Sequence, residues 1–282
     1  MKNLYYLLCL TVVLSLFSYR LEAAGLKVSP AGFILQDIVP GKVYDIYQET
    51  GLKLTVYNDD TVGHTYLLST HRPSEWGKWE KGYLEIPDPK WCWFEEDELT
   101  VGPNGQGYGN IFLKVPDEER YYNQHWVVVL RVMGKPGPGG IALAINVRIQ
   151  IETESKVDLK GKPDGVIGIV PSTVVLEKGG DGKKVTIFNN TDFPQTYKIY
   201  PLEEKEKLKT YISSGFKPLP EPKWLKLNKE TLKISPGSKK TFTVGLSAPE
   251  GETGTNEKWE YIVFVEGKDN TGFLRVRTSG AQ

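Results

Sequence analysis

One stretch of this chain occurs twice, and the repeat constrains the fold more than any other feature. The letters PDPKW at 87–91 return as PEPKW at 220–224, which is 133 positions later. The match extends upstream, where LTVYNDD at 54–60 aligns with VTIFNNT at 185–191, shifted by 131. Solenoid repeats recur about every 20 to 50 residues, so a period this long indicates a duplicated domain.

Residues that are identical in both copies indicate what one domain needs in order to fold. Both copies solve the same packing problem, so a shared tryptophan or asparagine has a structural explanation before it has a functional one. The identical pairs include Asn58 and Asn189, Tyr66 and Tyr197, Trp91 and Trp224, and Trp126 and Trp259.

Alternation of apolar and polar residues predicts strands in both copies. Leu52, Leu54 and Val56 alternate with polar neighbours, as do Val185 and Ile187, and a period of two indicates a half-buried strand. Roughly seven such segments with turn signals between them are typical of an immunoglobulin-like sandwich. We therefore predict an all-β chain of two tandem Ig-like β-sandwich domains, with a jelly roll or a small barrel as the alternative.

The predicted boundaries follow from the repeat. The first domain is expected over 25–152 and the second over 166–282. The segment between them, 153–165, is charged, contains Gly and Pro, and has the composition of a linker. The best candidate for a short helix is 205–214, where the second copy differs from the first.

The first 24 residues have the layout of a secretory signal peptide. A short positive start precedes an apolar run over 4–17, and small residues follow. The run is too short to span a bilayer comfortably, and an uncleaved membrane anchor is the alternative. We expect an extracytoplasmic protein, in the periplasm or at the cell surface, with no transmembrane anchor in the mature chain. Cys92 would then be alone, so the domains are held together without an internal disulfide.

Composition and motifs give no support to several function classes. Lys+Arg and Asp+Glu balance at 35 each, so the total charge gives no reason to expect a nucleic-acid partner or an anionic membrane surface. His64, His71 and His125 do not follow a metal-ligand pattern, and the acidic run at 95–98 lacks the spacing of a calcium loop. Phosphate-loop and nucleophile-elbow motifs are missing too. We predict no enzyme activity, no cofactor and no metal.

The order of short motifs resembles bacterial extracytoplasmic Ig-like modules, including the PapD-like superfamily in the broad sense. The copies open on VSP at 28–30 and VPS at 170–172, pass through an apolar strand into an Asn-rich turn, and then reach PKW. The resemblance covers most of both halves. It implies the β-sandwich fold of cell-surface, sheath and assembly proteins, and it specifies no single function.

The segment GGIALAINVRIQIE at 139–152 resembles the last strand of the first domain in periplasmic pilus chaperones. In that family the strand lends alternating large apolar side chains to an incomplete pilin subunit, and a basic pair grips the subunit's C-terminal carboxylate. Arg148 is the basic residue within this segment. The alternative is an ordinary final strand with one face on its own core. The candidate side chains for strand donation are Ile141, Leu143, Ile145, Val147 and Ile149.

Three tryptophans of the first copy have no tryptophan counterpart in the second. Trp76 and Trp79 lie where the shift between the copies changes, which indicates a loop, and Trp93 follows the first PKW. Loop aromatics that the repeat does not require are candidates for contact with a glycan or a protein. The alternative is local packing over an open end of the sandwich.

The function that fits these features is a secreted, non-catalytic structural or protein-binding component of the cell envelope. Its partners would be other envelope or surface proteins. Two alternatives remain open. One is a periplasmic assembly chaperone that donates the strand at 141–151, and the other is a carbohydrate-binding accessory module that uses the loop aromatics.

Overall fold

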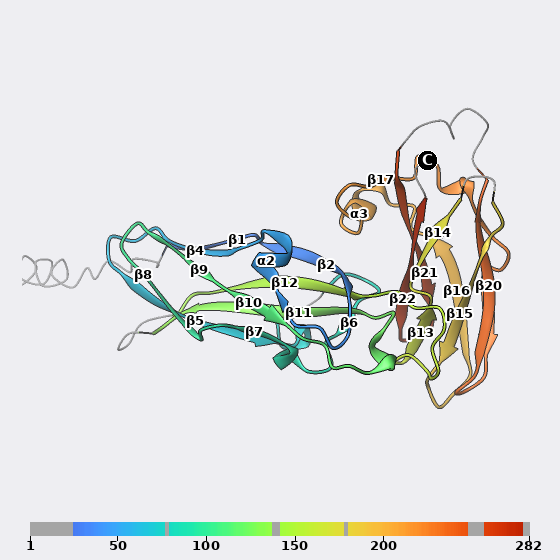
Figure 1. Ribbon diagram of the computed structural model, residues 1–282, viewed down its shortest axis with the longest axis horizontal. Helices are drawn as coiled ribbons and strands as arrows, with labels where there is room; N and C mark the ends of the chain where they lie inside the picture. The colour runs from blue at the N-terminus through green and yellow to red at the C-terminus, as the bar shows by residue number, and fades with distance from the viewer. Residues whose placement is uncertain (1–24, 77–78, 137–141, 178–179, 248–256, 279–282) are drawn as a thin grey trace, which may run out of the picture.

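The structure is a computed structural model, and nearly all of its regular secondary structure is β. Figure 1 shows two β-sandwiches, one along the long axis of the molecule and the other across it. The prediction of two tandem Ig-like sandwiches is confirmed, and the resemblance to PapD-like modules in the broad sense agrees with this architecture. The predicted signal peptide and Ile141 lie outside the described residues. The structure describes residues 25–76, 79–136, 142–177, 180–247 and 257–278.

The first sandwich, domain 1, is built from strands between Leu26 and Thr153. They are β1 (Leu26–Ser29), β2 (Gly32–Ile38), β3 (Tyr44–Asp45), β4 (Leu54–Asn58), β5 (His64–His71), β6 (Leu84–Glu85), β7 (Cys92–Phe94), β8 (Glu98–Val101), β9 (Gln106–Gly109), β10 (Ile111–Leu113), β11 (His125–Gly134) and β12 (Ala144–Thr153). One layer has the order β2-β12-β11-β5-β8, with β6 beside β11. The other layer consists of β1-β4-β9 and β3-β10-β7.

The second sandwich, domain 2, repeats this arrangement. Its strands are β13 (Ile167–Val170), β14 (Thr173–Leu176), β15 (Lys183–Asn189), β16 (Gln195–Pro201), β17 (Lys217–Pro218), β18 (Leu225–Leu227), β19 (Thr231–Ile234), β20 (Lys239–Leu246), β21 (Trp259–Glu266) and β22 (Thr271–Thr278). The layer β14-β22-β21-β16-β19, with β17 beside β21, has the same order as the large layer of domain 1. The other layer is β13-β15-β20-β18.

Short helices occur at the turns. The helix predicted over 205–214 is present only in its first half, as α3 (Lys205–Lys209), and α2 (Ile46–Thr50) was not expected from the sequence. The Asp45 side chain caps α2 by accepting a hydrogen bond from the backbone N–H of Gln48. The remaining helices are 3-10 turns, and both PKW motifs form one. They are η1 (Pro73–Glu75), η2 (Pro89–Trp91), η3 (Glu119–Tyr121) and η4 (Pro222–Trp224).

The two buried asparagines make the same contacts in both domains. The Asn58 amide donates to the carbonyls of Val62, Val101 and Gly102. The Asn189 amide donates to three carbonyls at the matching positions of domain 2. Each side chain is fully buried and joins the turn after one strand to the end of a strand in the opposite layer. This shared need explains why asparagine stands at both positions.

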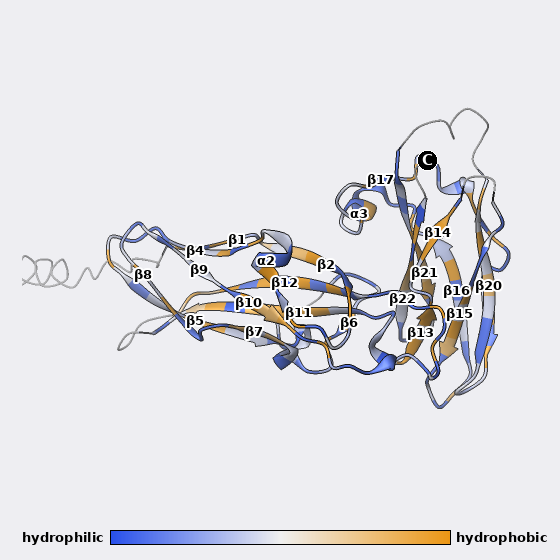
Figure 2. Cartoon of the chain, in the orientation of Figure 1, coloured by the Kyte–Doolittle hydropathy of each residue, from blue (hydrophilic) through white to orange (hydrophobic). Residues whose placement is uncertain are grey.

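The repeated tryptophans fill the end of each sandwich. Trp126 and Trp259 are almost completely buried on the central strands β11 and β21. Trp91 packs against Trp126 with ring centroids 5.7 Å apart, and Trp224 packs against Trp259 at 5.5 Å. Figure 2 shows apolar residues along the strands of both sandwiches. The repeated PKW motif therefore places one large ring of each pair at the core.

Replacing either asparagine should destabilise its own domain. We expect Asn58→Ala and Asn189→Ala each to lower the free energy of unfolding by about 2 to 4 kcal/mol, because three backbone carbonyls, one of them on a buried residue, lose their donor. Calorimetry of the two variants measures the effect. Asn146→Ala is the control, since Asn146 is exposed on β12 and should change stability by less than about 0.5 kcal/mol. Equal, small effects for all three variants would contradict this role.

Candidate functional site

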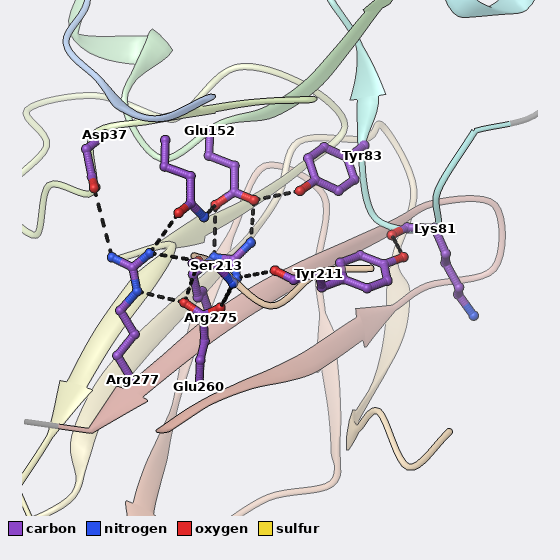
Figure 3. Close-up of polar contacts among 10 residues, drawn as sticks. Asp37, Lys81, Tyr83, Glu152, Tyr211, Ser213, Glu260, Arg275 and Arg277 are labelled. Atoms are coloured by element: carbon purple, nitrogen blue, oxygen red, sulfur yellow. Dashed lines mark hydrogen bonds and ion pairs between the residues drawn. The ribbon is translucent and has the colours of Figure 1, made fainter. Parts of the chain in front are cut away.

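The junction between the domains contains a buried ion pair. Glu152, near the end of β12, faces Arg275 on β22, and Figure 3 shows the two side chains meeting between the domains. The Arg275 Nε donates to Glu152 Oε2 at 2.9 Å, and its Nη2 donates to Glu152 Oε1. Arg275 is 0% exposed and Glu152 is 4% exposed. The pair is therefore bidentate and shielded from water, which is the geometry in which arginine binds a carboxylate most strongly.

A second carboxylate completes the coordination of Arg275. Its Nη1 donates to Glu260 Oε2 at 2.7 Å and to the backbone oxygen of Tyr211 at 2.7 Å. Glu260 also accepts from Arg277 Nε at 2.8 Å and from the Ser213 hydroxyl at 2.8 Å. Two arginines thus face two carboxylates, so no charge in this cluster is buried without a partner.

The same two carboxylate oxygens of Glu152 also accept hydrogen bonds from domain 1. The Tyr83 hydroxyl donates to Oε1 at 2.6 Å, and the Gln36 amide donates to Oε2 at 2.9 Å. Tyr83 can reach the junction because Gly82 precedes it with φ of +87°. A Cβ atom at Gly82 would lie 2.7 Å from the Phe273 ring of domain 2. Glycine is therefore required here both for the backbone conformation and for the close approach.

Aromatic rings surround the ion cluster. The His125 imidazole stacks on Phe273 with centroids 3.9 Å apart and an interplanar angle of 10°. Tyr83 packs edge-on against the same phenylalanine at 5.1 Å and stacks on Tyr211 at 6.1 Å. Tyr83 and Val127 of domain 1 belong to the same hydrophobic cluster as the core of domain 2. The junction is thus packed like a core, and it fixes how the two sandwiches are joined.

The electrostatics indicate a structural role for this cluster. Burial alone would raise the pKa of Glu152, but the Arg275 charge and the hydrogen bonds hold that pKa below its ordinary value. Burial, followed by the Glu152 charge, raises the pKa of Tyr83 well above its usual range. Burial also opposes the charge of Arg275, yet the two carboxylates raise its pKa. Glu152, Tyr83 and Arg275 are thus each held in their ordinary charge state, and these three groups are not prepared to donate or accept a proton near neutral pH.

Removing the buried guanidinium should separate the domains. We expect Arg275→Met to cost about 3 to 5 kcal/mol, because two carboxylates remain buried without a counter-charge. Arg148 is the matched control. Arg148 pairs with Val129 across the sheet, and Arg275 pairs with Ile262 in the same way, but the Arg148 side chain is half exposed.

The measurement combines denaturation with small-angle scattering. Arg148→Met should change stability by about 1 kcal/mol or less and leave the scattering profile unchanged. Arg275→Met should broaden the distribution of distances between the domains. A loss of stability that is the same in both variants would refute the assigned role of the junction.

His125 should make stability depend on pH. Burial lowers its pKa from 6.5 to about 4, so the folded protein holds the neutral ring. The unfolded chain binds the proton more tightly than the folded protein does. The contribution of His125 to stability is therefore complete above pH 6.5 and is lost as the pH falls from 6.5 towards 4. The loss amounts to about 3 kcal/mol. Unfolding measured from pH 7 to 4.5 should show this decline, which His125→Phe should remove and His71→Gln should retain. A variant His125→Phe with an unchanged pH profile would exclude this explanation.

The predicted partner strand is divided into an accessible end and a buried end. Leu143 is 40% exposed, and Ile145 is half buried against the core of domain 1. Val147 and Ile149 are fully buried in that core. Ile141 lies outside the described residues. Val147 and Ile149 thus pack in the core of domain 1, as an ordinary final strand would, whereas Leu143 is accessible to another protein.

The accessible end also has an unpaired edge. Ala144 to Val147 pair with β11 on one side, and the pairing of β12 with β2 on the other side starts only at Arg148. The preceding strand β1 pairs with β4 in the opposite layer. Within the described residues, Ala144 to Val147 thus have no strand paired with them on that side, although β1 lies nearby.

The loop aromatics occupy three different environments. Trp76 is 40% exposed, with the Arg131 guanidinium 3.7 Å from its ring centroid and the His71 ring edge-on at 5.5 Å. Trp79 packs against the core cluster of domain 2, and its indole donates to the Tyr83 backbone oxygen at 2.8 Å. Trp93 stacks on Phe112 at 5.6 Å. The structure does not bring these tryptophans together into one surface.

The other reactive residues have structural surroundings. His64 contacts Asp60 at 2.8 Å and His71 contacts Glu75 at 3.0 Å. Cys92 is completely buried, and burial raises the pKa of its thiol to about 12. Among the described residues no group of three or more His, Cys, Asp or Glu side chains could hold a metal ion. The same residues include no helix of the length and apolarity that crossing a membrane requires.

Glu152, Glu260 and Arg275 were not predicted from the sequence as a cluster. The signal that could have found them is a set of charged residues at alternate positions of the best-buried strands, as in TGFLRVRT at 271–278. Such positions point away from their own core, so a charge there needs either water or a second domain.

Comparisons with known proteins concern the fold. No family model matches the chain, and no curated protein matches it. Solved structures with some similarity include a protein of unknown function from Porphyromonas gingivalis W83 (13% identity, 90% of this chain and 99% of that one, TM-score 0.36). The periplasmic chaperone SfaE (12%, 90% and 99%, 0.32) and the E. coli chaperone DraB (12%, 91% and 98%, 0.32) are similar to the same extent. The fold is established by the strand pairing described above.

Proposed function

We propose that this chain is a non-catalytic, protein-binding component of the cell envelope that captures its partner by strand addition. The observation that carries the proposal is that, among the described residues, Ala144–Val147 of β12 pair with a strand on the β11 side alone, although β1 lies near their other edge. An exposed edge presents a row of backbone donors and acceptors that another chain can pair with. Main-chain hydrogen bonds then supply affinity, and alternate side chains supply specificity.

The side chains at this edge suit such a partner. Leu143 is exposed and Ile145 is half buried, so both apolar groups are available beside the free backbone. Val147 continues the same row into the core of domain 1. A partner strand on this edge could place its own apolar residues next to those of β12 and extend the core. This is the arrangement that the assembly-chaperone alternative requires, and it makes that alternative the favoured form of the proposal.

The domain junction supports the same interpretation. The buried ion cluster and the packed rings hold domain 2 against the end of domain 1. Preorganised partners lose less conformational entropy on binding than flexible ones do. A rigid pair of domains can therefore contact a partner with the β12 edge and with domain 2 at once.

Exposed and buried positions of the same strand provide the test. We expect Leu143→Asp to reduce partner capture at least about tenfold, since a charge would be buried at the paired edge, while the protein stays folded. Leu52→Asp is the control, because Leu52 is also exposed at 36% but precedes β4, whereas Leu143 directly precedes β12. Cross-linking and co-purification from the native envelope identify the partner, and titration with that partner measures the change.

The outcome distinguishes binding from packing. Val147→Asp should unfold domain 1, because Val147 is fully buried. If Leu143→Asp and Leu52→Asp captured the partner equally well, strand addition at β12 would be wrong. The carbohydrate-binding alternative depends mainly on Trp76, whose ring face is already in contact with Arg131, and a glycan array with Trp76→Ala tests it separately.

A further inference from the structure

The balanced total charge of the chain conceals a separation between the domains. Residues 25–152 contain 12 Lys and Arg against 17 Asp and Glu. Residues 166–282 contain 18 Lys and Arg against 14 Asp and Glu. Domain 1 is therefore acidic and domain 2 is basic. The balanced total charge therefore does not exclude an anionic surface as a partner of domain 2.

The basic charge of domain 2 gathers on one sheet. On β15, β18 and β20 the core-facing residues alternate with outward ones. Lys184, Lys226 and Lys239 point outward and are exposed. The outward threonines Thr186 and Thr241 lie on the same sheet, and their hydroxyls contact each other at 3.3 Å. Lys229 reaches the same sheet, where its ammonium donates to the Thr241 backbone oxygen at 3.2 Å. We call these four lysines the lysine face.

The lysine face carries uncompensated charge. None of its four ammonium groups forms an ion pair with a carboxylate in the part of the chain that the structure describes. By contrast, the α3 lysines Lys207 and Lys209 pair with Glu204 and Glu206. Unpaired like charges on adjacent strands repel one another, so a surface of this kind gains stability from a counter-charge supplied from outside.

The position of the sheet leaves it open to a large partner. Figure 1 shows β15 and β20 on the side of domain 2 that faces away from domain 1, and β20 begins with a hydrophilic stretch in Figure 2. The acidic domain is thus held at a distance from the lysine face by the rigid junction. A flat anionic surface could contact the whole sheet without meeting domain 1.

From this arrangement we infer that domain 2 docks through the lysine face onto an anionic lipid bilayer. The face contains lysines and threonines but no arginine, so it offers dispersed ammonium charges and lacks the guanidinium forks suited to bidentate recognition of single phosphates. Its one outward aromatic ring, Phe188, is 8% exposed and lies under the Lys239 ammonium. Stacking on sugars or bases is therefore not available there. Juxtamembrane basic residues bind anionic leaflets in this way, and the binding weakens as salt screens the charges.

Docking would also orient the molecule. With the lysine face on the bilayer, domain 1 points away from the lipid and displays its β12 edge to the surrounding space. The inference does not depend on strand addition, because the two surfaces belong to different domains.

Co-sedimentation of the full chain with vesicles tests the inference. We expect binding to vesicles that contain phosphatidylglycerol, little binding to phosphatidylcholine alone, and release at high salt. The triple variant K184Q/K226Q/K239Q should lower the partition coefficient about tenfold or more. The variant K205Q/K207Q/K209Q removes the same number of charges from α3, which lies outside the lysine face, and it should bind as the wild type does.

Several results would overturn the inference. These are equal binding to neutral vesicles, equal loss in both triple variants, or binding that resists salt. Binding to dextran sulfate without binding to vesicles would assign the face to an acidic polymer instead. Self-association in light scattering that K184Q/K226Q/K239Q removes, again without vesicle binding, would assign it to the acidic domain of a second copy. The salt dependence of the wild type needs no variant, so the inference stays testable even if a triple variant is unstable.

Discussion

The ion pair between Glu152 and Arg275 is the interaction on which the arrangement of this molecule depends. It joins the last strand of one sandwich to the last strand of the other, and it does so out of contact with water. Buried pairs contribute little net stability compared with apolar packing, but breaking one leaves an uncompensated charge. The pair therefore favours one particular joining of the domains over others that would bury the same apolar area. Glu260 also accepts hydrogen bonds from Arg277 and Ser213, and these bonds favour the same arrangement of the domains.

Comparison of the two copies separates what folds a domain from what joins the domains. The positions that agree, such as Asn58 with Asn189, hold the two layers of each sandwich together. The segments that differ meet at the junction. Trp79 comes from the loop where the shift between the copies changes, and Tyr211 follows the helix α3, which has no counterpart among the described residues of the first copy. A duplicated domain can dock on its twin only if some surfaces diverge, because identical surfaces rarely complement each other in a head-to-tail contact.

The two candidate binding surfaces lie on different domains and would bind their partners through different interactions. The start of β12 offers directional backbone hydrogen bonds beside apolar side chains, which suits a single protein strand. The lysine face offers long-range charge over a flat sheet, which suits an extended anionic surface. Neither surface needs a cavity, a metal or a perturbed proton donor. Because the junction is packed like a core, the two surfaces would keep a fixed orientation relative to each other.

The sequence by itself determined the number of domains, their strand character and the residues that each core repeats. Period-two alternation and the shift of 131 to 133 residues are patterns along the chain, so they can be recognised in the sequence without a structure. The short helix at Ile46–Thr50 was missed because a single capped turn has no periodicity to read. Only the tertiary structure decided that Glu152 meets Arg275, which is 123 positions away. Tertiary structure likewise decided that Val147 is core while Leu143 is exposed, and that four scattered lysines share one face. Contacts between distant segments depend on how sheets pack and domains dock, and no local pattern in the chain encodes that geometry.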